Sequence, residues 1–175
     1  MVKNKHIDIL VIGSGPGGYA AAFRAADLGR KVMLVDKDPT LGGVCLNRGC
    51  IPSKTLLHIA KVLEEAESLK KMGVTFSKPK IDIDSVRDGK NKVVSQLSNG
   101  IGQMAKARKV ETVQAEATFL SDTEVQLKID TKKETITFDH CIIAAGSSSS
   151  VIPGIPFENE NVLTSKTALD LKKIP

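Results

Sequence analysis

The sequence predicts an α/β fold in which a mainly parallel sheet carries a small antiparallel meander. Three observations lead to this prediction. An apolar run from Ile7 to Ile12 precedes a glycine turn, a helix-like segment and a second apolar run at 31–36. Short segments of alternating polarity lie between residues 118 and 138, and a further apolar run occupies 141–145. Continuous apolar runs are typical of buried parallel strands, whereas alternation is typical of antiparallel strands with one exposed face.

The first β-α-β unit is the clearest local pattern. Ile7–Ile12 is a predicted strand, Gly13–Gly18 a turn, and 19–28 a helix that ends before Gly29, a residue common just after helix C-termini. The segment 31–36 is the second strand. The unit has about 30 residues, which is the usual size for this motif.

The rest of the chain alternates between two predicted helices and several short strands. The segment 41–51 is a loop or a strained helix start, because it contains three glycines. Helices are predicted over 52–72 and 85–109, although Gly89, Gly100 and Gly102 weaken the second. The predicted later strands are 110–114, 118–120, 124–129, 134–138 and 141–145. Residues 147–156 form a flexible exit, and 164–174 an incomplete helix.

Composition limits the classes of function. Of the 175 residues 41% are hydrophobic and 3% aromatic, so the predicted core is aliphatic. The formal net charge of +5 is spread over scattered lysines and arginines, which indicates a solvated surface. The scarcity of aromatic side chains argues against single-stranded nucleic acid as a partner. No apolar run approaches the roughly 20 residues that span a bilayer, and the N-terminus lacks the pattern of a signal peptide. We therefore expect a cytoplasmic, bacterial protein without a membrane or nucleic-acid partner.

The glycine turn predicts a dinucleotide site. Gly13, Gly15 and Gly18 match the G-x-G-x-x-G pattern, and they lie between a strand and a helix, which is the context that the pattern requires. The first glycine permits a tight turn, the second lets a pyrophosphate approach the backbone, and the third lets the helix pack on the strand. Asp36 ends the second strand and is placed to accept hydrogen bonds from a ribose. The turn alone does not distinguish FAD from NAD.

Cys45 and Cys50 form the second candidate site. A disulfide needs Cα atoms about 4.4–6.8 Å apart. Residues five apart on a regular helix are separated by about 8.6 Å, so a bond requires a departure from helical geometry that Gly49 and Pro52 permit. The bond would close a short loop, which suits opening and closing better than stabilising a fold. Alternatives are two buried thiols or a metal site, although no further Cys or His pair has ligand spacing.

These motifs carry a family resemblance. The segment from Gly42 to Lys54 reads Gly-Gly-Val-Cys-Leu-Asn-Arg-Gly-Cys-Ile-Pro-Ser-Lys. With the Rossmann-like glycine turn, it resembles the N-terminal part of the dihydrolipoamide dehydrogenase branch of the pyridine nucleotide–disulfide oxidoreductase family. The resemblance extends from Ile7 to the end of the chain. It implies an FAD/NAD(P)-binding fold that is truncated relative to the family.

The resemblance also implies roles for individual residues. FAD would bind the glycine turn, with Cys50 against the isoalloxazine ring, Lys54 near the flavin and Asp36 at the adenosine ribose. Cys45 would exchange with a dithiol substrate, so both cysteines are expected to be catalytic. No metal is expected. The expected cofactor-binding residues are Gly13, Gly15, Pro16, Gly17, Gly18, Asp36, Lys37, Gly42, Gly43, Val44, Cys45, Cys50, Lys54, Ala117, Ala145 and Gly146.

Some features depart from the family pattern. Asp36 stands where Glu is commoner, Ala117 where Gly is frequent, and Ser148 where Arg is usual. The family continues well beyond this length, with an NAD domain and an interface domain that supplies a His-Glu base to the other subunit. None of the three histidines is expected to take that role, and Cys141 is expected to be a small core residue. We predict an FAD-binding domain over 1–150, and over 151–175 a linker and the start of the next domain.

The resemblance implies a reaction for the full-length enzyme. Dihydrolipoamide would reduce the Cys45–Cys50 disulfide, and the electrons would pass through FAD to NAD+. Expected partners are the lipoyl domains of 2-oxoacid dehydrogenase complexes, and the full-length form is expected to be a homodimer. The 175 residues alone are expected to lack this turnover. The alternatives are a non-catalytic flavin-binding fragment and a related disulfide reductase of the glutathione or mercuric type.

Overall fold

A computed structural model describes residues 5–170 and divides them into two compact units. The first contains the residues up to Cys45 together with Leu97–Ser147. The second contains Leu46–Gln96 and the residues from Ser148 onward. The predicted domain boundary at residue 150 stays a prediction.

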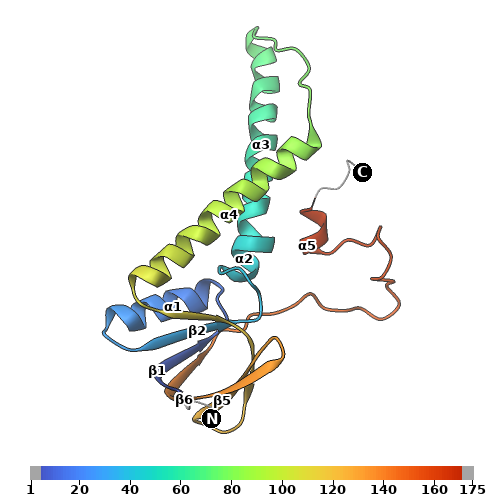
Figure 1. Ribbon diagram of the computed structural model, residues 1–175. Helices are drawn as coiled ribbons and strands as arrows, with labels where there is room; N and C mark the ends of the chain where they lie inside the picture. The colour runs from blue at the N-terminus through green and yellow to red at the C-terminus, as the bar shows by residue number, and fades with distance from the viewer. Residues whose placement is uncertain (1–4, 171–175) are drawn as a thin grey trace. The chain divides into compact units, whose positions relative to one another are not determined.

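The first unit is built on a mixed sheet (Figure 1). Within the described residues the sheet has six strands in the order β3-β2-β1-β6-β5-β4. The strands β3, β2, β1 and β6 are parallel to one another, and β6, β5 and β4 are antiparallel. Their bounds are β1 Lys5–Ile12, β2 Val32–Asp36, β3 Glu111–Gln114, β4 Glu116–Phe119, β5 Glu124–Ile129 and β6 Lys132–Ile143. The predicted combination of a Rossmann-like parallel sheet and an antiparallel meander is confirmed.

The first β-α-β unit forms as predicted, with one shift. Helix α1 spans Pro16–Asp27, so it begins inside the segment that was expected to be the turn. Pro16 occupies the first helical position, where its fixed φ suits the helix and its missing N–H removes no hydrogen bond. Gly29 follows the helix with φ +81°, the left-handed conformation expected after a helix end.

One sequence prediction about the strands is wrong. The segments 134–138 and 141–145 were expected to be separate strands, but they belong to the single strand β6. The polar pair Asp139 and His140 interrupts the apolar pattern without interrupting the ladder, because His140 lies opposite Ile9 of β1. The side chain of His6 on β1 contacts Asp139 at 3.2 Å and Thr137 at 3.1 Å, so polar side chains meet across the exposed face of these strands.

The core of the first unit is aliphatic, as the composition predicts. Its buried cluster contains one aromatic residue, Phe138, and the other members are Ile7, Leu10, Met33, Val35, Ala115, Val125, Leu127 and Ile136. These side chains come from both the parallel and the antiparallel strands. Burial of such side chains contributes about 1.5–3 kcal/mol each, so the two parts of the sheet stabilise each other through one core.

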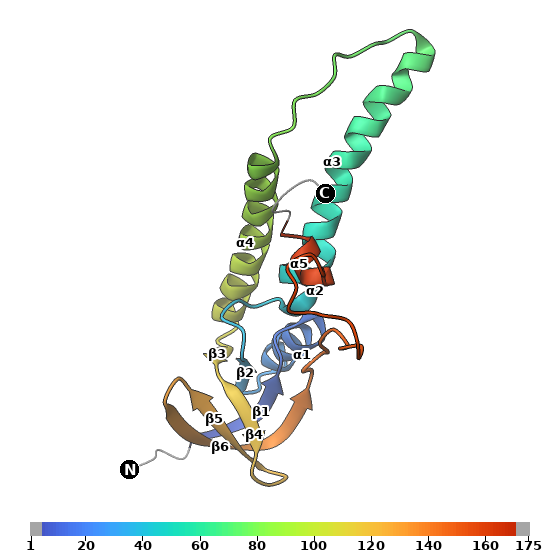
Figure 2. The same cartoon turned by 90° about the vertical axis from the view of Figure 1, so that its right-hand side faces the viewer.

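Long helices dominate the residues between the two halves of the first unit (Figure 2). Their bounds are α2 Gly43–Arg48, α3 Cys50–Ser68, the 3₁₀ turn η1 Leu69–Met72 and α4 Ile83–Ala107. Gly73 follows η1 with φ +89°, directly after the predicted helix end at residue 72. The extended segment 74–82 connects η1 to α4. Helix α4 persists through its three glycines, and it buries Ser98, Ile101 and Ala105.

The C-terminal segment contains one short helix, α5, over Ser165–Ala168. Lys90 of α4 is 4% exposed, and its ammonium group donates a 2.6 Å hydrogen bond to the Leu169 carbonyl. Burial lowers the pKa of Lys90, and the charge of Asp170 partly opposes that effect. The predicted incomplete helix over 164–174 is confirmed for α5, while residues 171–175 lie outside the described residues. In the described part of the chain no helix is both long and apolar enough to cross a membrane.

Candidate functional site

The glycine turn after β1 is closely packed against the end of β6. Gly13 has φ +102°, and a Cβ atom there would lie 2.2 Å from the Ala144 carbonyl oxygen. A Cβ atom on Gly18 would lie 1.7 Å from the Gly13 carbonyl oxygen. Real Cβ atoms do not approach backbone oxygens so closely. Gly13 and Gly18 are therefore required by the turn and by the packing of α1 on it.

Gly15 differs from these two glycines because the protein leaves room at it. A Cβ atom there would find its nearest neighbour, the Gly43 Cα atom, at 3.9 Å, and the residue has the ordinary φ of −67°. Gly15 is the N-cap of α1, and no side chain caps that helix end. The first N–H groups of a helix lack intrahelical partners and attract anions. An uncapped helix start beside a residue without a side chain fits the pyrophosphate of a dinucleotide.

Asp36 is held at the end of β2 by the turn itself. One of its carboxylate oxygens accepts hydrogen bonds from the Ser14 N–H at 2.7 Å and the Ser14 hydroxyl at 2.6 Å. Its other oxygen accepts from the Asp38 N–H at 2.9 Å. The structure thus brings the predicted ribose acid to the predicted phosphate turn. The sequence analysis missed Ser14, because the position between two motif glycines accepts many residue types.

The loop before the cysteines packs on the same turn. The Gly42 N–H donates to the Ser14 carbonyl at 2.9 Å, and a Cβ atom on Gly43 would lie 2.6 Å from the Gly15 Cα atom. The Ser98 hydroxyl of α4 donates to the Leu41 carbonyl at 2.9 Å. The sequence analysis also missed Ser98, since no local pattern links residues 57 positions apart.

Two further predicted segments lie next to these residues. The Ala115 N–H donates to the Asp36 carbonyl at 2.8 Å, and Ala117 follows on β4 and packs partly against the core. At the end of β6 the Ala144 N–H donates to the Ile12 carbonyl at 2.7 Å, and Gly146 has φ +67°. The first unit therefore gathers the glycine turn, Asp36, the 41–43 loop, Ala117 and Gly146, all of which were expected near the cofactor.

The cysteine segment is broken between its two cysteines. Cys45 lies on α2, and Cys50 is the first residue of α3. Gly49 separates the two helices with φ −146° and ψ −103°, outside the helical region. Pro52 lies in the first turn of α3, where a missing N–H removes no hydrogen bond. The predicted departure from one regular helix is confirmed. Both cysteines are thiols in the structure, so the Cys45–Cys50 disulfide stays a prediction.

Other candidate residues occupy varied surroundings. Cys50 and Lys54 are exposed on α3, and their approach to a flavin stays a prediction. His58 is also exposed on α3. Cys141 lies on β6 and packs against the core while remaining partly exposed, and burial raises the pKa of its thiol.

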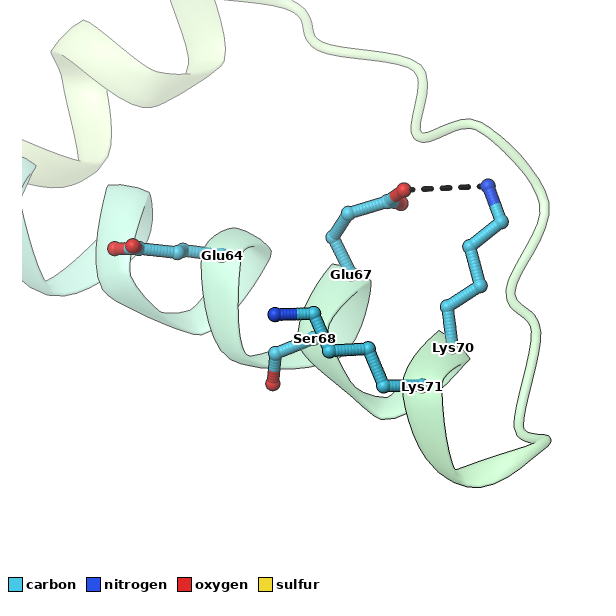
Figure 3. Close-up of a pocket in the computed structure, with 5 residues that line it drawn as sticks. All are labelled: Glu64, Glu67, Ser68, Lys70 and Lys71. Carbon is cyan, nitrogen blue, oxygen red and sulfur yellow. Dashed lines mark hydrogen bonds and ion pairs between the residues drawn. The ribbon is translucent and has the colours of Figure 1, made fainter.

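A surface hollow at the far end of α3 is unrelated to these motifs. Exposed polar side chains line it, and Glu67 and Lys70 form an ion pair at 3.4 Å there (Figure 3). None of the motif residues contributes to it. Within residues 5–170 no group of three or more His, Cys, Asp or Glu side chains is placed to hold a metal ion.

Comparison with known proteins places these features in one family. A family model described as pyridine nucleotide-disulphide oxidoreductase matches residues 7–175. The chain is 51% identical over 176 residues to a dihydrolipoyl dehydrogenase of Haemophilus influenzae, and the match covers 100% of this chain and 37% of that protein. Similar proteins of the same name occur in Bacillus subtilis, at 45% identity over 168 residues, and in Haloferax volcanii, at 43% over 171. Those matches cover 96% of this chain and 35% and 36% of the relatives.

The chain thus spans little more than a third of the relatives' length. The family model covers residues 7–175, which include both the glycine turn and the break at Gly49 between the two cysteines. This chain belongs to the pyridine nucleotide-disulphide oxidoreductase family.

Proposed function

We propose that this chain is the FAD-binding part of a dihydrolipoyl dehydrogenase whose redox-active disulfide joins Cys45 and Cys50. The observation that carries the proposal is the open backbone at Gly15, at an uncapped helix N-terminus beside Asp36. The protein's own packing requires glycine at residues 13, 18 and 43 but leaves room for a side chain at residue 15. A bound pyrophosphate gives a reason for glycine there.

The residues of this chain would bind and orient the cofactor in separate ways. The N–H groups at the start of α1 would hold the phosphates, while Asp36 would lie at the ribose. Ala117 and Gly146 would supply further backbone contacts to the cofactor. Bound FAD would supply the two-electron chemistry that links the dithiol to NAD+.

The cysteines would carry out thiol–disulfide exchange. One thiolate of a dithiol substrate attacks the Cys45 sulfur of the disulfide, which forms a mixed disulfide and releases Cys50 as a thiolate. The second substrate thiolate then attacks the mixed disulfide, which releases Cys45 and closes the substrate's own disulfide. The substrate dithiol loses two electrons and the protein disulfide gains them. Dihydrolipoamide is the proposed substrate because of the named relatives.

The full-length protein would act with partners that this chain does not reveal. From the family we infer a homodimer that works in the cytoplasm on lipoyl domains of 2-oxoacid dehydrogenase complexes. The similarity to several bacterial dihydrolipoyl dehydrogenases supports this inference.

Binding of FAD tests the proposal. FAD is titrated into the purified 175-residue chain, and the change in flavin fluorescence is measured. We expect saturable binding, and at least about a tenfold loss of affinity in Gly15→Ala, because the added methyl group occupies the space of the pyrophosphate. The fold should survive, since the new Cβ atom meets the protein only at 3.9 Å.

Gly100→Ala is the matched control, because nothing lies within 4 Å of a Cβ atom at that helical glycine. Its affinity for FAD should equal that of the unmodified chain. A chain that causes no saturable change in flavin fluorescence, or a Gly15→Ala variant that binds as well as the parent, would contradict the proposal.

A further inference from the structure

Two buried serines hold the loop that leads into Cys45. Ser14 is 0% exposed and Ser98 is 8% exposed. The Ser98 hydroxyl donates to the Leu41 carbonyl at 2.9 Å, and the Ser14 carbonyl accepts from the Gly42 N–H at 2.9 Å. Consecutive loop residues are thus held from two sides, by α4 and by the phosphate turn.

The same hydrogen bonds continue to the end of β2. The N–H and hydroxyl of Ser14 both donate to one carboxylate oxygen of Asp36. A series of hydrogen bonds therefore connects Asp36, Ser14, the 41–43 loop and Ser98. Hydrogen bonds to a charged carboxylate are stronger than neutral ones, so the bonds to Asp36 should hold Ser14 firmly in place.

Steric contact couples the loop to the turn as well. Gly43 has φ +60°, and a Cβ atom there would lie 2.6 Å from the Gly15 Cα atom. The backbones of the two segments therefore touch at the residue that leaves room for a pyrophosphate. A shift of the loop would displace Gly15 or open a gap beside it.

The burial of the Ser14 and Ser98 hydroxyls indicates that their hydrogen bonds have a structural role. A hydroxyl removed from water is unfavourable unless it forms hydrogen bonds. Both serine hydroxyls form theirs with groups of the loop or of Asp36. Ser14 occupies an unspecified position of the glycine motif, and Ser98 lies outside both motifs. An alanine at residue 98 would lose the hydrogen bond to the loop, and an alanine at residue 14 would lose the hydroxyl bond to Asp36 while keeping the two backbone bonds.

We propose that Ser98 and Ser14 are positioning residues that fix the 41–43 loop against the phosphate turn, and so set both the affinity for FAD and the placement of Cys45. Ser98 acts through the Leu41 carbonyl, and Ser14 acts through Asp36 and Gly42. The link to FAD rests on the proposed function, whereas the link to the loop rests on the hydrogen bonds alone.

The principal test compares Ser98→Ala with Ser95→Ala, which alters an exposed serine on the same helix. Hydrogen exchange of the amides of residues 42–44, the FAD dissociation constant and the alkylation rate of Cys45 are measured for each. Loss of one neutral hydrogen bond corresponds to a change of about three- to tenfold. We expect Ser98→Ala to accelerate loop exchange and Cys45 alkylation, and to weaken FAD binding, by about that factor. Ser95→Ala should change none of the three.

Ser14→Ala provides a second test that keeps the N–H bond to Asp36 and therefore stands even if Ser98→Ala does not fold. It should weaken FAD binding by a similar factor. The double variant should lose less than the product of the two single losses, because both hydroxyls belong to one connected set of hydrogen bonds.

The outcomes separate the two proposals. Unchanged exchange of residues 42–44 in both serine variants would overturn the positioning role. Faster exchange in a chain that binds no FAD would support the positioning role and contradict the proposed cofactor. Faster exchange with unchanged FAD affinity would overturn the link between the loop and the cofactor.

Discussion

The two compact units differ in how closely backbone segments approach one another within each unit. In the first unit, a Cβ atom on Gly13, Gly18 or Gly43 would lie within 3 Å of another backbone atom. In the second unit, nothing lies within 4 Å of a Cβ atom on Gly73 or Gly89. Gly13, Gly18 and Gly43 thus permit close backbone contact, whereas Gly73 permits only a left-handed helix end.

The units also differ in how they bury side chains. The first has a continuous cluster of buried residues from both parts of its sheet. In α3 only Pro52 is buried, and large apolar side chains such as Met72 and Phe76 are exposed at 80% and 59%. The continuous core indicates that the first unit supplies most of the stability of this chain, and that Gly13 and Gly18 have a structural role in it. Three predictions test this comparison.

Gly18→Ala should have the largest effect. The Gly13 carbonyl oxygen would lie 1.7 Å from the new Cβ atom, and a backbone oxygen cannot move aside as a side chain can. We expect a loss of about 3 kcal/mol or more in the free energy of unfolding, at the upper end of overpacking effects. Urea denaturation followed by circular dichroism measures it. Gly17→Ala is the control, since its Cβ atom would lie 4.0 Å from its nearest neighbour, and it should fall within about 1 kcal/mol of the parent. Equal stability of the two variants would refute the packing argument.

The second prediction concerns the rates at which Cys50 and Cys141 are alkylated. Cys141 packs against the core of the first unit and has a raised thiol pKa, whereas Cys50 is exposed on α3. A raised pKa leaves less thiolate at a given pH, and the thiolate is the reactive form. We expect iodoacetamide to modify Cys141 more slowly than Cys50 in the reduced chain at pH 8, because burial both raises the pKa of the Cys141 thiol and limits access to it. The Cys141 rate should continue to rise at higher pH.

Peptide mapping by mass spectrometry follows both sites in one sample. The same chain in 8 M urea, a concentration on the order of that which unfolds small domains, is the control, and there the two rates should converge. Equal rates in the folded chain would show that the sheet does not protect Cys141.

Gly89→Ala should have the smallest effect, with the opposite sign. Gly89 lies inside α4, and a Cβ atom there meets nothing within 4 Å. Alanine should therefore stabilise the helix by up to about 1 kcal/mol. Gly73→Ala is the matched control, because φ +89° is strained for alanine, and it should destabilise the chain by about 1 kcal/mol. Thermal unfolding measures both. A loss of stability in Gly89→Ala would mean that the second unit packs more closely at this helix than the glycine contacts indicate.

The sequence alone determined the local elements and the motif residues. The first β-α-β unit, the helix end at Gly29 and the break between Cys45 and Cys50 all follow from residue types at short spacing. Such features depend on backbone preferences and on the periodicity of apolar side chains, which are written into neighbouring residues. The helix start at Pro16 shows the limit of this precision, because glycine and proline also occur in the first turn of a helix.

Only the tertiary structure decided which distant groups meet. It made β6 one strand, since pairing with β1 carries the ladder through the polar pair Asp139 and His140. It placed Asp36 against Ser14, and Ser98 against the loop before Cys45. Hydrogen bonds between residues far apart in sequence depend on strand register and helix position, and neither serine carries a local signal of its partner. The physical reason is that periodicity specifies which face of an element is buried, whereas packing between elements specifies which atoms on those faces touch.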